Sequence, residues 1–249
     1  MTHVKPEART VRVGSGEIGV VVCHGFTGST GSVAGWANAL AASGLRVVAP
    51  RLSGHGTSWQ DLDASTWQEW YADVAAAYYE LALDCRQVFV AGLSMGGALA
   101  LRLAEMHDVA GVLLVNPAIG SHDPRFKLTR WLHWLVPALP GIASDIKKPG
   151  VVEPGYSHVS VKAAHQMTKL WALVQRDLHR VEVPTLLFKS TEDHVVDTLT
   201  REILTATLPK LQTIELANSY HVATMDNDAE VINTESVRFI RAQLGDDAA

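Results

Sequence analysis

The sequence predicts an α/β protein with a doubly wound, mostly parallel sheet. Short apolar runs rich in β-branched residues alternate with helix-length stretches along most of the chain. The runs are nearly continuous in hydrophobicity, as in strands that helices cover on both faces. Of the 249 residues, 47% are hydrophobic and 19% charged, which provides enough apolar material for a large core.

The expected elements follow this alternation in order. An antiparallel edge strand is expected at residues 10–13, before the first parallel strand. Parallel strands are expected at 18–23, 45–49, 88–91, 109–115, 184–189 and 213–216, with helices at 35–43, 67–83, 98–106 and 233–244. Parallel neighbours need crossover connections, and the helix-length stretches supply them.

The alternation stops between residues 119 and 180, where we expect a small helical cap inserted after the strand ending near Val115. No strand is evident in this stretch. Its clearest pattern is an apolar stripe with helical spacing, formed by Ala164, Met167, Trp171, Val174 and Leu178. The chain would then divide into an α/β core, residues 1–118 and 181–249, and a cap, residues 119–180.

Charge and cysteine content exclude several functions. The net charge is −5 and no run of three Lys or Arg residues occurs, so no nucleic-acid or anionic-membrane partner is expected. Residues 18–45 lack charged side chains, but glycines interrupt them, so no stable membrane insertion is expected.

Cys23 and Cys85 could form one disulfide. Reduced thiols in a cytoplasmic protein are the better interpretation of so few cysteines.

A serine nucleophile is indicated by residues 92–96, Gly-Leu-Ser-Met-Gly, between an expected strand and an expected helix. Such a turn is strained, and its glycines remove side chains that would collide. The alternative is an ordinary glycine-rich turn. An oxyanion next to Ser94 would need two backbone donors, and the N–H groups of Met95 and Phe26 are the natural pair. His24 is expected to brace the loop that carries Phe26.

A general base and its acidic partner are expected on later loops at the carboxyl edge of the sheet. His221 follows the last strand, and Asp193 follows the strand before it. Asp193 would accept the Nδ1–H of His221, leaving Nε2 free to take the proton of Ser94. Glu192 and Asp197 are the alternative acids, and His194 is the alternative base. No spacing typical of metal ligands occurs, so no metal is expected.

Five motifs together resemble the α/β-hydrolase superfamily in order and spacing. They are HGFTG at 24–28, SGHG at 53–56, GLSMG at 92–96, EDHVV at 192–196 and SYHVATMD at 219–226. Within that superfamily the chain looks like small bacterial carboxylesterases and monoacylglycerol lipases over essentially its whole length.

The resemblance implies a cap over the active site, and Ile119 to Arg180 would have to supply it. It also implies that Glu153, three residues before Tyr156, senses the glycerol hydroxyls; a solvated loop glutamate is the alternative. Ile142 is a further pocket candidate. Four apolar residues could line an acyl tunnel or form the cap's own core: Trp131, Trp134, Met167 and Trp171.

The expected function is therefore a cofactor-free serine carboxylic ester hydrolase. Its substrates would be short- or medium-chain acyl esters, monoacylglycerols among them, and a homodimer through the cap is one option for assembly. The same fold serves thioesterases, C–C bond hydrolases and cofactor-free perhydrolases, and some members bind ligands without turnover. These remain the alternatives.

Overall fold

The computed structural model describes residues 3–132, 134, 136–141 and 144–245. Its strands are β1 (Val11–Val13), β2 (Ile18–Cys23), β3 (Arg46–Ala49), β4 (Gln87–Leu93), β5 (Val112–Val115), β6 (Ala138–Pro140), β7 (His158–Ser160), β8 (Thr185–Ser190) and β9 (Leu211–Leu216). Its α-helices are α1 (Ala34–Ala42), α2 (Trp59–Ala64), α3 (Trp67–Ala82), α4 (Met95–Met106), α5 (Arg125–Leu132), α6 (Val161–Asp177), α7 (Leu199–Thr207) and α8 (Ala229–Leu244). The pocket candidate Ile142 lies outside the described residues.

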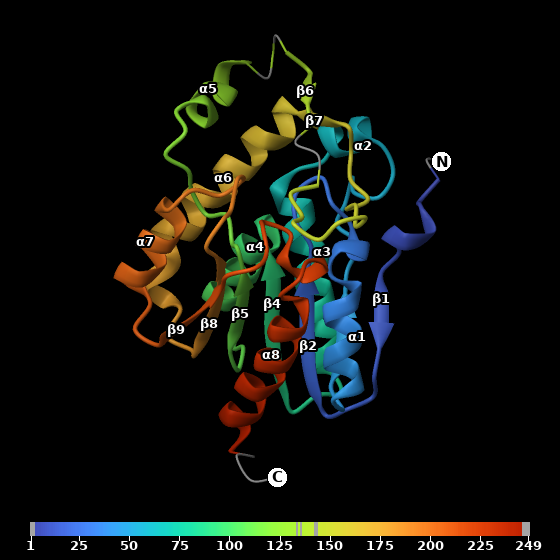
Figure 1. Ribbon diagram of the computed structural model, residues 1–249, viewed down its shortest axis with the longest axis vertical. Coiled ribbons are helices and arrows are strands. Elements are labelled where there is room, and N and C mark those ends of the chain that lie inside the picture. Colours follow the sequence, from blue (N-terminus) through green and yellow to red (C-terminus); the bar gives the residue numbers. More distant parts are fainter. Residues whose placement is uncertain (1–2, 133, 135, 142–143, 246–249) are drawn as a thin grey trace.

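Seven strands form the main sheet in the order β1-β3-β2-β4-β5-β8-β9 (Figure 1). All neighbours run parallel except β1, which pairs with β3 in antiparallel fashion, Val11 opposite Ala49. The expected parallel sheet with an antiparallel edge strand is confirmed. Because the parallel strands point the same way, the loops that follow β2, β4, β5, β8 and β9 meet at one edge of the sheet.

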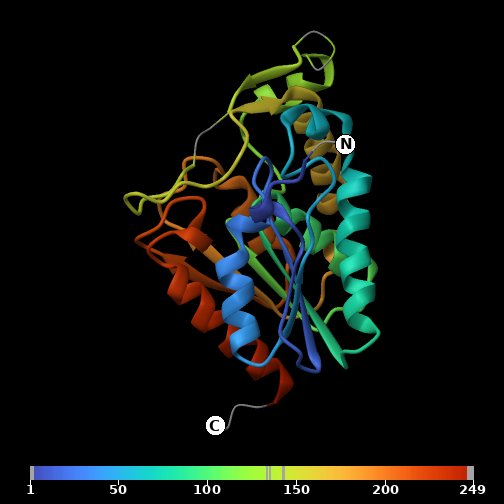
Figure 2. The ribbon, with the colours of Figure 1, turned by 90° about the vertical axis from the view of Figure 1, so that its right-hand side faces the viewer.

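Helices cover both faces of the sheet, and β4 shows why. Its side chains alternate between two buried clusters: Val88 and Val90 face one, Phe89 and Ala91 face the other. The first cluster includes α3, α4 and α6, whereas the second includes α1 and α8. Figure 2 shows α1 and α8 together on one side of the sheet and α3 on the other. Burial on both faces accounts for the continuous apolar runs in the sequence.

The segment between β5 and β8 rises beyond the carboxyl ends of the strands (Figures 1 and 2). It contains α5 and α6, but the expectation of no strand was wrong: β6 and β7 form a small antiparallel sheet, Ala138 opposite Ser160. Each strand has three residues, too few for an alternating pattern to emerge, and Pro140 lies inside one of them.

The apolar stripe at 164–178 is confirmed, since all five of its residues are buried, four on α6 and Leu178 directly after it. Val174 lies in the same buried cluster as Leu99 and Leu103 of α4, so the end of α6 packs on the core. Trp131 and Trp134, by contrast, are 67% and 82% exposed, so neither forms a core for this segment. Within the described part of the chain, no helix combines the length and apolar character that crossing a membrane requires.

Candidate active site

Ser94 lies on a strained turn between β4 and α4. Its backbone has φ 55° and ψ −121°, a region that residues other than glycine rarely adopt. The strain is held by hydrogen bonds: the Ser94 N–H donates to the Val115 carbonyl at 3.0 Å, and the Ser94 carbonyl accepts from Gly97 and Ala118. The turn thus orients Ser94 rigidly at the end of β4.

The glycines around Ser94 are required by close backbone contacts. A Cβ at Gly92 would lie 2.2 Å from the Gly96 carbonyl oxygen, and a Cβ at Gly96 would lie 2.2 Å from that of Cys23. Both distances are far below any real contact, so a larger residue at Gly92 would push the start of α4 away from β4, and one at Gly96 would push α4 away from the end of β2. These close contacts explain why the sequence has glycine at both positions.

The loop after β2 lies directly against Ser94. A Cβ at Gly25 would be 3.3 Å from the Ser94 Cβ, so the loop backbone passes within contact distance of the serine. Phe26 follows and lines the same pocket as Ser94. Met95 is the first residue of α4, where no helix carbonyl precedes its N–H. Among the described residues, no hydrogen bond from the N–H of Phe26 or Met95 is found.

His24 is buried in this loop and has both ring nitrogens engaged. Nδ1 lies 3.0 Å from the Gly25 carbonyl oxygen, and Nε2 accepts the Leu52 N–H at 3.3 Å. Burial lowers the pKa of His24 to about 4, so the ring is neutral at pH 7. The geometry suits bracing of the loop and leaves no ring nitrogen for proton transfer.

His221 and Asp193 are joined by a hydrogen bond, with 3.0 Å between His221 Nδ1 and Asp193 Oδ1. Both side chains are almost fully buried. Burial alone would raise the pKa of Asp193, but the hydrogen bond to His221, together with the nearby charges of His221 and Lys189, holds it well below its ordinary range. Asp193 is therefore ionised and directed at the histidine.

The alternative acids and base are engaged elsewhere. The Asp197 carboxylate accepts hydrogen bonds from Ser121 and from the backbone of His122. Glu192 lies 3.7 Å from Lys147, more than half exposed. His194 pairs with Asp145 at 2.9 Å, and this hydrogen bond raises the pKa of His194.

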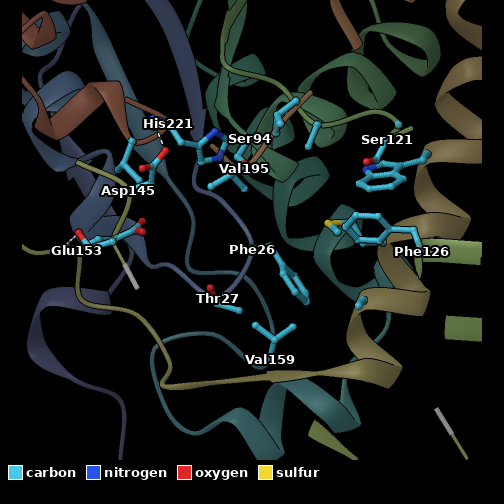
Figure 3. A pocket seen from close by; sticks show the side chains of 18 residues that line it. Phe26, Thr27, Ser94, Ser121, Phe126, Asp145, Glu153, Val159, Val195 and His221 are labelled. Carbon is cyan, nitrogen blue, oxygen red and sulfur yellow. Dashed lines mark hydrogen bonds between the residues drawn. The ribbon is translucent and has the colours of Figure 1, made fainter. Parts of the chain in front are cut away.

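One pocket is lined by Ser94, His221 and Phe26, and its empty volume is about 890 Å³ including its open mouth. In Figure 3, Ser94 and His221 lie beside each other, Asp145 and Glu153 lie toward the same end, and Phe126 lies at the other. The Phe126 end is mainly apolar, because the ring of Trp171 lies 4.9 Å from that of Phe126 and Met167 lies one turn earlier on the same helix. A polar end and an apolar end suit an ester with an acyl chain.

Glu153 enters the pocket from the segment between β5 and β8. Ser32 donates to its Oε1 at 2.5 Å, and the Glu153 N–H donates to Ser144 Oγ at 2.8 Å. Burial raises the pKa of Glu153, although the bond from Ser32 and the proximity of His221 act against the shift. Glu153 is thus partly buried and held by hydrogen bonds at the edge of the pocket.

Tyr156 does not line the pocket. Its hydroxyl donates to the Gly54 carbonyl at 2.8 Å and accepts from the Thr57 N–H at 2.9 Å. These bonds attach the segment between β5 and β8, called the inserted segment below, to the loop after β3. Of the four tunnel candidates, Met167 and Trp171 line the pocket, whereas the exposed Trp131 and Trp134 do not.

Two residues that bind the backbone of His221 were not predicted from the sequence. Asp145 Oδ2 accepts the His221 N–H at 3.1 Å and the His194 N–H at 3.2 Å. Asn116, buried at the end of β5 with φ 41°, donates to the His221 carbonyl at 2.8 Å and accepts the Ser190 N–H at 2.9 Å. A polar residue at the carboxyl end of a buried strand could have signalled Asn116; no pattern singles out Asp145.

Residues 17–228 match the model of the family described as serine aminopeptidase, S33. The chain belongs to this family. It is a hydrolase with the α/β-hydrolase fold. Among the described residues, no group of three or more His, Cys, Asp or Glu side chains is placed to hold a metal ion.

Proteins similar to this chain include a lipase and an esterase. The chain is 36% identical over 245 residues to a thermostable monoacylglycerol lipase of Bacillus sp. (strain H-257), covering 93% of each chain. A carboxylesterase of Bacillus subtilis (strain 168) is 23% identical, with 96% of this chain and 98% of the relative covered. A solved structure from work on LipS and LipT, two metagenome-derived lipolytic enzymes, has a TM-score of 0.93 at 38% identity, covering 96% of this chain and all of that one.

Proposed function

We propose that this hydrolase cleaves carboxylic esters through Ser94, His221 and Asp193. His221, held by Asp193, takes the proton of Ser94 as its oxygen attacks the ester carbonyl. The N–H groups of Phe26 and Met95 hold the oxyanion, and the alcohol leaves with a proton from His221. Water then cleaves the acyl-enzyme by the same route. The observation that carries the proposal is that the strained Ser94 shares one pocket with His221, which is hydrogen-bonded to Asp193.

The substrates that we propose are short- and medium-chain acyl esters, with monoacylglycerols foremost. The apolar end of the pocket would take the acyl chain. Glu153, partly buried near His221, would accept a hydrogen bond from a glycerol hydroxyl at the polar end. The 36% identity to a monoacylglycerol lipase supports this choice.

We further propose that residues 119–180 act as a cap on a core of residues 1–118 and 181–249. Side chains from this segment form much of the pocket wall. We also propose a homodimer through the cap, which would cover the exposed Trp131 and Trp134. A monomeric mass by light scattering at all concentrations would exclude it. Two free thiols, Cys23 and Cys85, support a cytoplasmic location; secretion of the native protein into the medium would exclude it.

Substitution of Ser94 tests the mechanism. Ser94→Ala removes the nucleophile, so kcat for p-nitrophenyl butyrate should fall by at least about 10³-fold. A fluorophosphonate probe should label Ser94 in the wild type, as peptide mapping would show. Full esterase activity in Ser94→Ala, or labelling of a different residue, would overturn the proposal. Labelling without ester turnover would instead favour a thioesterase, a C–C bond hydrolase, a perhydrolase or a ligand-binding protein.

Substitution of Glu153 tests the substrate. Glu153→Ala should lower kcat/KM for monoacylglycerols by about tenfold or more, because the hydroxyl partner is lost, while p-nitrophenyl butyrate turnover changes little. Glu153→Gln should lose less, since it keeps an acceptor. Glu182→Ala is the control, because Glu182 is exposed and lies outside the pocket. Equal losses on both substrates would show that Glu153 does not recognise glycerol.

A further inference from the structure

The buried strand β8 carries one cation among apolar side chains. Its six residues are all buried, and Lys189 is among them, with its side chain 11% exposed. An ammonium group loses its hydration on burial and is tolerated only beside an opposite charge. Lys189 must therefore have a compensating partner, and the strand register decides which one it meets. Lys189 is the fifth residue of β8, on the same face as Leu187.

The partner of Lys189 is Asp193, the acid proposed above for the hydrolytic site. The Lys189 Nζ lies 2.6 Å from Asp193 Oδ2, and the Asp193 side chain is 3% exposed. The ammonium also lies 3.4 Å from the Val196 carbonyl oxygen. This ion pair is nearly excluded from water, so it is screened far less than a surface pair.

The two oxygens of Asp193 have different partners. Oδ1 is 3.0 Å from His221 Nδ1 and also accepts the N–H groups of Val195 and Val196. Oδ2 accepts from Lys189. The carboxylate that faces His221 is thus bound on its opposite side to a fixed positive charge. The negative potential at the imidazole is that of a carboxylate–ammonium pair, which is weaker than that of a carboxylate alone.

We propose that Lys189 is a positioning residue that sets the pH range in which His221 works as the base. The proposal rests on the function proposed for Ser94, His221 and Asp193. Lys189 holds Asp193 Oδ1 toward His221 and offsets part of the carboxylate charge. With Lys189 in place, the enzyme is therefore expected to remain active in more acidic solution than it would without this charge.

Other charged and titratable groups also surround His221. From the inserted segment come Asp145, which accepts the His221 N–H, and Glu153, whose pKa responds to His221. The loop after β8 contributes His194, paired with Asp145, and Glu192, paired with Lys147. These groups are unchanged in the variants below, so a difference in pH profile reports the charge of residue 189.

The test is the pH profile of kcat/KM for p-nitrophenyl butyrate. Lys189→Gln keeps a hydrogen-bond donor but removes the charge, so the acid limb of the profile should move to higher pH by about one unit. Lys189→Arg keeps the charge, so its acid limb should stay within a few tenths of a unit of the wild type. Arg12→Gln removes the same charge from a surface pair with Glu80 and should leave the profile unmoved.

Lys189→Met is measured beside Lys189→Gln in case the glutamine does not pack, and near-UV circular dichroism confirms that each variant is folded. A folded Lys189→Gln or Lys189→Met enzyme with an unmoved acid limb would overturn the inference, and a uniform loss of kcat would assign Lys189 a structural role only. Full activity of Ser94→Ala would refute the proposed function instead, whatever the position of the limb.

Discussion

Gly96 is needed because another chain segment occupies the space of a side chain. A Cβ there would meet the Cys23 carbonyl oxygen at 2.2 Å, at the end of β2 that leads into the Phe26 loop. Gly96→Ala should therefore lower the free energy of unfolding by about 1–3 kcal/mol. The strand would have to move away from Ser94, so esterase activity should fall as well. Urea unfolding and kcat/KM for p-nitrophenyl butyrate measure the two effects.

Gly35 provides the matched control for this substitution. It is exposed within α1, and a Cβ there would meet nothing within 4 Å. Gly35→Ala should raise the free energy of unfolding by about 0.5–1 kcal/mol, because alanine favours the helix. If both variants lost stability equally, contact with the end of β2 would not be the reason for glycine at position 96.

At the scale of single residues, the sequence could indicate side chains that belong to a local pattern. Ser94 lies within a glycine motif, and His221 and Asp193 follow strands whose carboxyl ends meet. Asp145 and Lys189 belong to no such pattern. Their contacts with the loops after β8 and β9 depend on the path of the inserted segment and on strand register, which only the folded chain defines.

At the scale of the elements, Asp145 links the inserted segment to two loops of the core, those after β8 and β9. Its carboxylate accepts the N–H groups of His194 and His221, and its carbonyl accepts that of Val222. Asp145→Asn places an amide donor where two donors converge, so His221 should lose its fixed position. We expect kcat to fall by about tenfold with a smaller change in KM, because misplacement by a fraction of an ångström slows proton transfer.

Asp123→Asn controls for loss of an acidic charge from the same segment. Asp123 pairs with the exposed Arg125 and does not line the pocket. Steady-state kinetics on p-nitrophenyl butyrate should leave this variant close to the wild type. A fall in kcat as large as that of Asp145→Asn would point to the charge of the whole segment instead of the contact with His221.

Elements were predictable where burial on both faces left a continuous apolar run. The core strands β2, β4 and β8 were expected within a few residues of their bounds. The short elements β6, β7, α2 and α7 were not, because three to nine residues give too little periodicity. In the case of α4, the expected start at residue 98 was late, since the helix begins at Met95 directly after the strained serine.

For the molecule as a whole, a buried charge cluster joins the core to the inserted segment. Arg102 on α4 lies 2.9 Å from Glu105 and 2.8 Å from Asp177, the last residue of α6. Burial raises the pKa of Glu105 from 4.5 to about 7, and the bond from Arg102 only partly offsets this. One Glu105 oxygen, Oε1, is buried without a hydrogen-bond partner among the described residues.

The raised pKa of Glu105 makes stability depend on pH. Below pH 4.5 the carboxyl group is protonated in both the folded and the unfolded chain, so it adds no penalty. Between pH 4.5 and about 7 the unfolded chain loses its proton first, so the free energy of unfolding falls as the pH rises. Above pH 7 Glu105 is ionised in the folded chain as well. The free energy of unfolding is then lowered by the full cost of burying a carboxylate of which one oxygen has no hydrogen-bond partner among the described residues.

Glu105→Gln should remove this dependence, because glutamine stays neutral and can still accept from Arg102. Urea unfolding at pH 8 should find the variant more stable than the wild type, on the order of 2 kcal/mol, with the difference much smaller at pH 5. Glu80→Gln should behave oppositely, since the bond from Arg12 lowers the pKa of Glu80 and favours its ionised form. If Glu105→Gln were less stable than the wild type at pH 8, the ion pair with Arg102 would outweigh burial. The ion pairs would then stabilise the packing of the inserted segment on the core, and this stabilisation would increase as the pH rises.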